Sequence, residues 1–216
     1  MYLAERIEAG KLQLLEITEQ ALLNHEDSGV RIEKVSSAAG MSPGVIYSHF
    51  KSREGLLDAA YLHIYQKQNN AMCALLRDKV PSVLAGQSIL EKLYEFELDH
   101  NVATALNQGR ALRLRIHARA VSRKSFRTQF QKIQDVHLAE VASILDLMND
   151  SPVSQSPNRD TRHLALFLEV LATGRATSEV SSTPIPLKAW FAFVDHAVRT
   201  MPMPEDVRVT RLVEAS

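Results

Sequence analysis

The sequence predicts an all-α fold, and three observations lead to this prediction. Leu, Ala, Glu, Gln and Arg, which are good helix formers, dominate the 216 residues. Only eight glycines interrupt so long a chain. Apolar residues recur at helical spacing and do not alternate as they do in strands. We therefore expect about nine helices, arranged as an amino-terminal three-helix unit, a long connecting helix and a larger helical body.

The first three helices form the amino-terminal unit. The first is expected over residues 3–25, where apolar side chains follow a helical period. The second covers about residues 30–39 and breaks at Gly40, whose backbone freedom suits a tight turn. The third begins after Ser42, a good N-cap, with Pro43 at the first helical position. Helix, tight turn and short helix is the layout of a helix-turn-helix.

The remaining helices form the body. Ser52 caps a long fourth helix, which Pro81 is expected to stop. This helix is the only continuous element that the sequence indicates between the two regions. Five more helices are expected, over residues 87–104, 107–120, 123–149, 160–177 and 185–200. The predicted domains are therefore residues 1–54 and residues 55–216.

The bulk composition favours a folded protein and argues against several classes. With 45% apolar and 23% charged residues, the chain has an ordinary globular composition. No apolar stretch approaches the ~20 residues of a membrane span, and the amino terminus has no signal-peptide core. We therefore expect a cytoplasmic protein with no membrane partner. The single cysteine, Cys73, is expected to be a buried side chain rather than a catalytic thiol.

The outward side of the third helix is small and polar, as a helix that lies on DNA requires. Ser42, Pro43 and Gly44 permit a close backbone approach, and the N–H groups at a helix start favour phosphate. Further donors are Arg31, Tyr47, His49, Lys51 and Arg53. Because the formal net charge is zero, only a local face could attract DNA. The alternative is a helical corner that packs and never touches DNA.

Four short motifs in this region carry a resemblance to a known family. They are Ala39-Gly40, Ser42-Pro43-Gly44, Tyr47-Ser48-His49-Phe50, and Ser52-Arg53 followed by Leu56-Leu57. Together they resemble the DNA-binding signature of the TetR (tetracycline-repressor-like) family. The resemblance implies that Val45 and Ser48 join Ser42 near base edges. It also implies phosphate contacts from Tyr47, His49 and Arg53, and a homodimer on a palindromic operator.

Two late segments are apolar nearly all round and therefore need cover on both sides. Residues 164–172 are apolar except for Glu169, and residues 185–198 repeat the pattern. The cover comes either from the subunit alone or from the subunit and a partner. The resemblance implies that the last two long helices form a dimer bundle. The expected interface residues are Leu164, Phe167, Leu168, Leu171, Trp190, Phe191 and Val194.

The resembling family binds a small-molecule effector in the body. Candidate residues for this role are Tyr94, Phe96, His100, Arg113, His117, Phe130 and His137. Arg110, Arg113 and His117 share one helix face, which suits an anionic group such as a carboxylate. In the alternative, the basic stretch over residues 100–134 is a solvated surface that pairs with acids elsewhere. His137 is either a pocket residue or a core histidine with a satisfied hydrogen bond.

Enzyme functions find no support in the sequence. There is no Gly-rich phosphate loop, no paired His-Glu metal motif and no Gly-x-Ser-x-Gly context. No metal and no cofactor are therefore expected. The resemblance implies a ligand-responsive regulator, a homodimeric repressor that a small molecule releases from double-stranded operator DNA. The alternative is a helical ligand-binding or scaffold protein whose helix-turn-helix is only a packing module.

Overall fold

The computed structural model describes residues 2–85, 88–98, 100–149 and 161–200. Within these ranges the chain forms nine helices of at least seven residues and no strand, so the all-α prediction is confirmed. The helices are α1 (Tyr2–Gly29), α2 (Ile32–Ala38), α3 (Pro43–Phe50), α4 (Arg53–Leu84), α5 (Ile89–Glu97), α6 (His100–Ser122), α7 (Lys124–Asn149), α8 (Thr161–Glu179) and α9 (Leu187–Thr200). No helix in the described ranges is long and apolar enough to cross a lipid bilayer.

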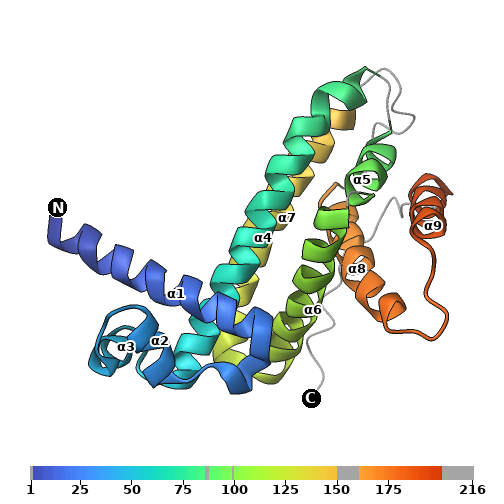
Figure 1. The fold of residues 1–216 in the computed structure, drawn as a ribbon. Helices are drawn as coiled ribbons and strands as arrows, with labels where there is room; N and C mark the ends of the chain where they lie inside the picture. The colour runs from blue at the N-terminus through green and yellow to red at the C-terminus, as the bar shows by residue number, and fades with distance from the viewer. Residues whose placement is uncertain (1, 86–87, 99, 150–160, 201–216) are drawn as a thin grey trace, which may run out of the picture.

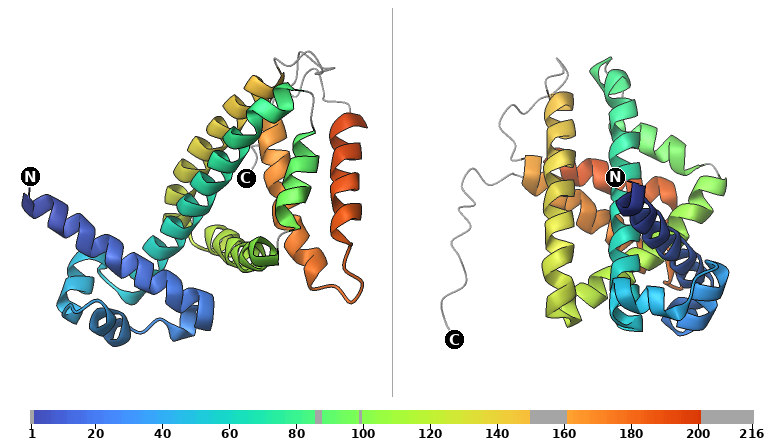
Figure 2. Two further views of the ribbon diagram at one scale, coloured as in Figure 1. Left: turned by 45° about the horizontal axis from the view of Figure 1, so that its top comes forward. Right: turned by 90° about the vertical axis from the view of Figure 1, so that its left-hand side faces the viewer.

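The first three helices gather at one end of the molecule (Figure 1). From this end α4 leads away as one helix of 32 residues, and α7 runs beside it, as both figures show (Figure 2). α8 packs on α6 and α7, whereas α9 packs on α5 at the outer edge of the body. α4 thus extends from the amino-terminal unit to the far end of the body.

One apolar core joins the amino-terminal helices to the body. Leu22, Ile46 and Leu57, from α1, α3 and α4, are completely buried in this core. Ile116 of α6 and Phe126 of α7 are buried in the same cluster. Each buried side chain of this size stabilises the fold by roughly 1.5–3 kcal/mol. The boundary proposed at residue 54 therefore does not separate two hydrophobic cores.

Two predicted helix boundaries differ from those in the structure. Pro81 lies inside α4, which continues to Leu84, so the prediction that proline stops this helix is wrong. A proline removes one backbone donor, and Val83 packs beyond it against the core between α4 and α7. Likewise α5 ends at Glu97 and α6 begins at His100, whereas the sequence predicted the break after residue 104.

Two glycines shape the connections around α3. Gly40 has a φ of +65°, in the left-handed region that residues with a Cβ rarely adopt. Gly55 lies in the first turn of α4, where an added Cβ would overlap the carbonyl oxygen of Phe50. The backbone N–H of Gly55 donates to the N-cap oxygen of Ser52 at 3.0 Å. The end of α3 therefore rests directly on the start of α4.

Gly55→Ala should lower the free energy of unfolding by about 2 kcal/mol or more, because the methyl group fits only if α3 moves off α4. Urea denaturation measures this loss. Gly44→Ala is the matched control, since the nearest atom to its added Cβ is Ser42 Oγ at 3.6 Å. The control should be as stable as the parent or slightly more stable. Equal losses in the two variants would contradict the close contact.

Candidate functional site

α3 turns one face to the core and the other to solvent. Ile46 and Phe50 are buried, and Val45 is half-buried against the same core. The opposite face consists of exposed residues: Ser42, Pro43, Gly44, Tyr47 and Ser48. The side predicted to lie on DNA is therefore an accessible surface of the protein.

The start of α3 carries small groups that the fold does not use. Ser42 is the N-cap residue, but its side chain makes no capping hydrogen bond. Gly44 has neither a positive φ nor a close neighbour that would require glycine. Pro43 occupies the first helical position, where its missing N–H costs nothing. A polyanion can thus approach the backbone at this helix end without meeting a large side chain.

The polar residues around the end of α3 partly bond to the helix itself. The Ser48 hydroxyl donates to the Val45 carbonyl at 2.8 Å. Lys51 has a φ of 68° although it is not glycine, and its Nζ donates to the Ser48 carbonyl at 3.1 Å. The ring centroid of His49 lies 5.9 Å from that of Phe50. Tyr47, 49% exposed, is the most open aromatic side chain on this face.

Arg53, for which the resemblance implies a phosphate contact, hydrogen-bonds to the backbone of the helix-turn-helix unit. Its Nε donates to the Val30 carbonyl at 2.7 Å, and its Nη2 donates to the Asp27 carbonyl. Its Nη1 lies 3.3 Å from a carboxylate oxygen of Glu54. The guanidinium is therefore engaged with the junction of α1 and α2, where it anchors the start of α4.

A basic hollow lies at the amino-terminal end of α2. Arg31, the exposed N-cap residue of α2, lines it together with His25, Ser28, Gly29 and Lys34, and its volume is about 380 Å³. Arg31 thus keeps the exposure that a phosphate contact requires. Lys34, which the sequence reading did not select, adds a second cation on this side.

The basic stretch of α6 and α7 pairs with acids, as one of the two sequence hypotheses expected. Arg110 lies 2.5 Å from Glu179 and 3.7 Å from Glu97. Arg113 pairs with Glu169 at 3.3 Å. These side chains are not solvated, however, because those of Arg110 and Arg113 are only 11% and 15% exposed. Arg110 and Arg113 thus place two positive charges in the interior of the body.

A buried polar group lies where α4, α6, α7 and α8 meet. We call it the Glu169 cluster; its members are Tyr65, Asn69, Arg113, His117, Gln134 and Glu169. Tyr65 Oη donates to Glu169 Oε1 at 2.6 Å, and Arg113 Nη2 donates to Asn69 Oδ1 at 2.6 Å. Four helices therefore contribute polar groups to one interior site.

Aromatic rings close one side of the Glu169 cluster. The ring centroid of Phe130 lies 4.7 Å from that of Tyr65 and 5.2 Å from that of His117. The Arg113 guanidinium carbon lies 5.0 Å from the Tyr65 ring centroid, a cation–π distance. The site thus offers charged, hydrogen-bonding and aromatic groups within a small space.

Burial changes the proton affinities around this site. Desolvation lowers the pKa of His117, although the neighbouring carboxylate of Glu169 opposes the shift. Desolvation likewise raises the pKa of the Tyr65 hydroxyl, so Tyr65 remains a donor near neutral pH. His117 Nε2 and Asn69 Nδ2 are buried and make no hydrogen bond within the described part of the chain. Hydrogen-bonding capacity therefore remains for a further group.

His137 and Cys73 form a separate contact between α7 and α4. Cys73 Sγ lies 3.5 Å from His137 Nδ1, and both side chains are buried. Burial raises the pKa of Cys73 to about 11, so the thiol stays protonated. This environment agrees with the expected buried cysteine and makes His137 a core residue with a polar neighbour.

The other predicted effector residues lie apart from the Glu169 cluster. Tyr94 packs edge-on against Phe191 of α9, with ring centroids 5.8 Å apart. Phe96 is half-buried on α5, and the side chain of His100 lies outside the described residues. Of the seven candidates, the structure thus brings together Arg113, His117 and Phe130. Tyr65, Asn69, Gln134 and Glu169 were not among the predicted effector residues.

The predicted dimer residues occupy several environments within the subunit. Leu164 and Val194 are buried in the subunit itself. The half-buried ones are Phe167, Leu168, Leu171, Trp190 and Phe191. The exposed apolar residues of these helices are instead Leu166 and Val170 on α8 and Phe193 on α9. Val170 is 59% exposed and Phe193 is 63% exposed.

Comparison with known proteins gives one family match and several similar folds. Residues 22–60 match the family of bacterial regulatory proteins called the tetR family. Among curated proteins no significant match was found. A TetR-family protein of Rhodococcus sp. is 20% identical, with a TM-score of 0.62, covering 88% of this chain and 96% of its own.

Two similar structures hold ligands of different chemistry. One is a Saccharomonospora viridis protein in complex with choline, 15% identical, with a TM-score of 0.56 over 90% of this chain and 97% of its own. The other is the Bacillus subtilis regulator FadR in complex with stearoyl-CoA, 14% identical, with a TM-score of 0.50 over 88% and 97%.

The match to residues 22–60 covers the end of α1, all of α2 and α3 and the start of α4, the part that carries the exposed face of α3. The similar folds cover almost the whole chain. The amino-terminal helix-turn-helix thus matches the tetR family of bacterial regulatory proteins, and the chain as a whole is similar in fold to TetR-family regulators.

Proposed function

We propose that the protein is a ligand-responsive transcriptional repressor that binds a palindromic operator as a homodimer. The observation that carries this proposal is the exposed, small-residue start of α3, with Ser42 unused as a cap and Gly44 free of any packing constraint. A helix that served only to pack would gain stability from a larger residue at position 44. A helix that enters a groove gains closer backbone approach instead.

Contacts with DNA divide into two kinds. Ser42, Ser48 and the solvent-exposed part of Val45 meet base edges. Tyr47, His49, Lys51 and Arg31 meet phosphates. Side chains on phosphates set affinity and register, and side chains on bases set sequence preference. Arg53 acts on DNA binding indirectly. Its hydrogen bonds to the Val30 and Asp27 carbonyls hold α4 against the helix-turn-helix.

Fluorescence anisotropy with the promoter region upstream of the coding sequence tests DNA binding. The protein should bind this DNA at low salt and lose affinity steeply as salt rises. Tyr47→Ala should weaken binding to matched and mismatched sites about equally, while Ser42→Ala should change the preference among sites. Gly44→Ala should fold normally and bind more weakly. If a folded dimer shows no salt-sensitive binding to this DNA, the helix-turn-helix is only a packing module and the proposal is wrong.

The dimer uses the exposed apolar residues of α8 and α9. Leu166 and Val170 lie four residues apart on one face of α8, and Phe193 is exposed on α9. Interfaces of lasting dimers are apolar and bury ~800 Å² or more per subunit. A two-fold partner would cover these side chains and double the number of base contacts.

Val170→Asp should convert the dimer to monomers, because a carboxylate would be buried without a partner at the interface. Light scattering of the purified chain gives the mass directly. Val136→Asp is the matched control, since Val136 is 68% exposed on α7 and lies outside the proposed interface. A dimeric Val170→Asp variant would remove α8 from the interface.

The effector binds at the Glu169 cluster. This proposal rests on the buried polar groups His117 Nε2 and Asn69 Nδ2, which have no hydrogen-bond partner in the described part of the chain. Choline and stearoyl-CoA, the ligands bound in two proteins of similar fold, differ in charge. The fold alone therefore does not select the ligand, and the side chains of this cluster must do so.

A compound that releases the promoter DNA from the protein should act about tenfold more weakly on Arg113→Met, a loss of ~1.4 kcal/mol. Arg113 contacts both Asn69 and Glu169, so its loss alters the whole cluster. The control is Arg77→Met, which removes a surface pair with Glu140 farther along α4. Equal responses of the two variants would place the ligand elsewhere.

A further inference from the structure

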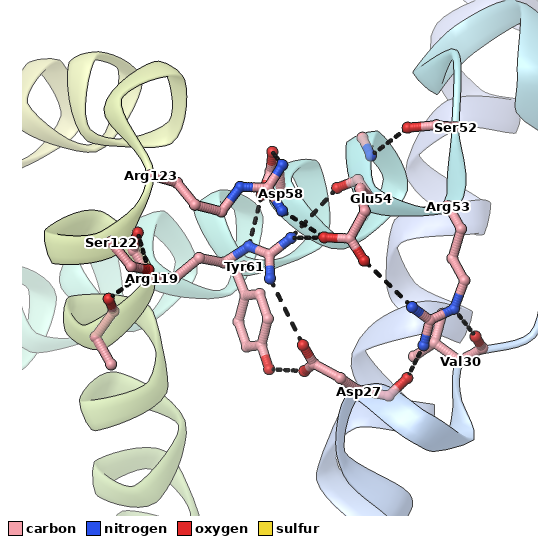
Figure 3. A network of polar contacts seen from close by, with 12 residues as sticks. Asp27, Val30, Ser52, Arg53, Glu54, Asp58, Tyr61, Arg119, Ser122 and Arg123 are labelled. Atoms are coloured by element: carbon pink, nitrogen blue, oxygen red, sulfur yellow. Dashed lines mark hydrogen bonds and ion pairs between the residues drawn. The ribbon is translucent and has the colours of Figure 1, made fainter.

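The carboxy end of α6 contacts both α4 and α1 through a polar group drawn in Figure 3. We call it the Arg119 cluster; its members are Asp27, Glu54, Asp58, Tyr61, Arg119 and Arg123. Arg119 Nε donates to Asp58 Oδ1 at 2.5 Å, and its Nη2 donates to Glu54 Oε2 at 2.7 Å. Its Nη1 lies 3.6 Å from Asp27 Oδ2. One guanidinium thus contacts carboxylates of two helices.

Arg119 is also enclosed by aromatic rings. Its guanidinium carbon lies 5.6 Å from the ring centroid of Tyr61 and 5.9 Å from that of Phe126. The Arg119 side chain is 11% exposed. Desolvation alone would lower the pKa of Arg119, but hydrogen bonds to Asp58 and Glu54 more than offset it and raise the pKa. The Arg119 side chain therefore stays charged in a largely buried site, where its electrostatic interactions are stronger than in water.

Further contacts of the Arg119 cluster reach the helix-turn-helix. The Tyr61 hydroxyl donates to Asp27, so the last turn of α1 is bound to α4 as well as to α6. Glu54 also pairs with Arg53, and Arg53 in turn donates to the Val30 carbonyl at the α1–α2 junction (Figure 3). Any shift of the end of α6 therefore acts on the segment that sets the position of α2 and α3.

Arg123 differs from Arg119 although it shares two of the same acids. It contacts Glu54 and lies 3.2 Å from Asp58 Oδ2, with its side chain 34% exposed. Ion pairs as exposed as this contribute little to stability. Arg119 combines the α1 and α4 carboxylates in one place, and its loss would leave them facing one another.

We propose that Arg119 is a positioning residue that holds the helix-turn-helix at a fixed angle to the body. This role rests on the proposed function in one respect. Only in the proposed dimer does a fixed angle set the spacing between the two α3 helices. Arg119 itself lies at the junction of α6, α4 and α1. The sequence indicated only α4 as a continuous element between the two regions.

Hydrogen–deuterium exchange of the full chain without DNA tests the positioning role. Arg119→Met keeps the length and apolar body of the side chain and removes its charge. In this variant, amides of residues 25–34 and of the first two turns of α4 should exchange about tenfold faster, with α8 unchanged. Unchanged exchange in these segments, or an equal increase along the whole chain, would overturn the proposal.

Two further variants keep the test decisive. Arg127→Met is the control, because the Arg127 guanidinium donates to the nearby Ala120 and Val121 carbonyls. Exchange at residues 25–34 should not change in this variant. Asp27→Asn removes the α1 carboxylate and leaves the α4 pairs of Arg119 in place. It should speed exchange at the end of α1 even if Arg119→Met fails to fold. No effect of Asp27→Asn would also overturn the proposal.

A DNA measurement separates positioning from general stabilisation. The parent dimer should lose about tenfold or more in affinity when one base pair is inserted between the half-sites, since half-site spacing is fixed by the protein. Arg119→Met should bind more weakly to the natural spacing and lose less than about threefold on insertion. An unchanged spacing preference would refute positioning. Absence of DNA binding by the parent would refute the proposed function, and exchange would still decide the role of Arg119.

Discussion

The contact of the Arg119 guanidinium with Asp58, Glu54 and Asp27 sets the angle between the helix-turn-helix and the helical body. α4 connects these two parts covalently, but a single helix can bend and roll. The Arg119 contact adds a second connection from α6 and thereby opposes rotation about the α4 axis. Because the apolar core also runs through this junction, charge and packing act on the same few turns. The helix-turn-helix is therefore held as part of the body.

The helix-turn-helix could be predicted from the sequence because its determinants are local. A tight turn at Gly40, an N-cap at Ser42 and a proline at the first helical position lie within four residues of one another. Helix boundaries in the body were less predictable. The break before His100 falls where no glycine or proline marks it. The extra turn beyond Pro81 exists because Val83 packs against a distant part of the chain.

The interior site could be predicted only in part, because its partners come from four helices. Arg113, His117 and Phe130 were selected as polar or aromatic residues at suitable positions. Tyr65 was missed because a tyrosine on an apolar helix face has no distinctive spacing. Glu169 was visible as the one charged residue in an apolar run, but nothing local indicates that Tyr65, 104 residues away in sequence, donates to it. The hydrogen bonds of Arg53 could not be predicted for the same reason, since its acceptors are the backbone carbonyls of Val30 and Asp27.

α6 carries a residue of each polar cluster, which gives the proposed response to ligand a physical route. Arg113 belongs to the Glu169 cluster and Arg119 to the Arg119 cluster, and six residues of helix separate them by ~9 Å. A helix transmits a shift over that distance with little bending. A ligand that bound better to one position of α6 would favour one angle of the reading unit, and operator DNA would change ligand affinity by the same factor. Coupling would then be limited by how firmly Arg119 holds its three carboxylates.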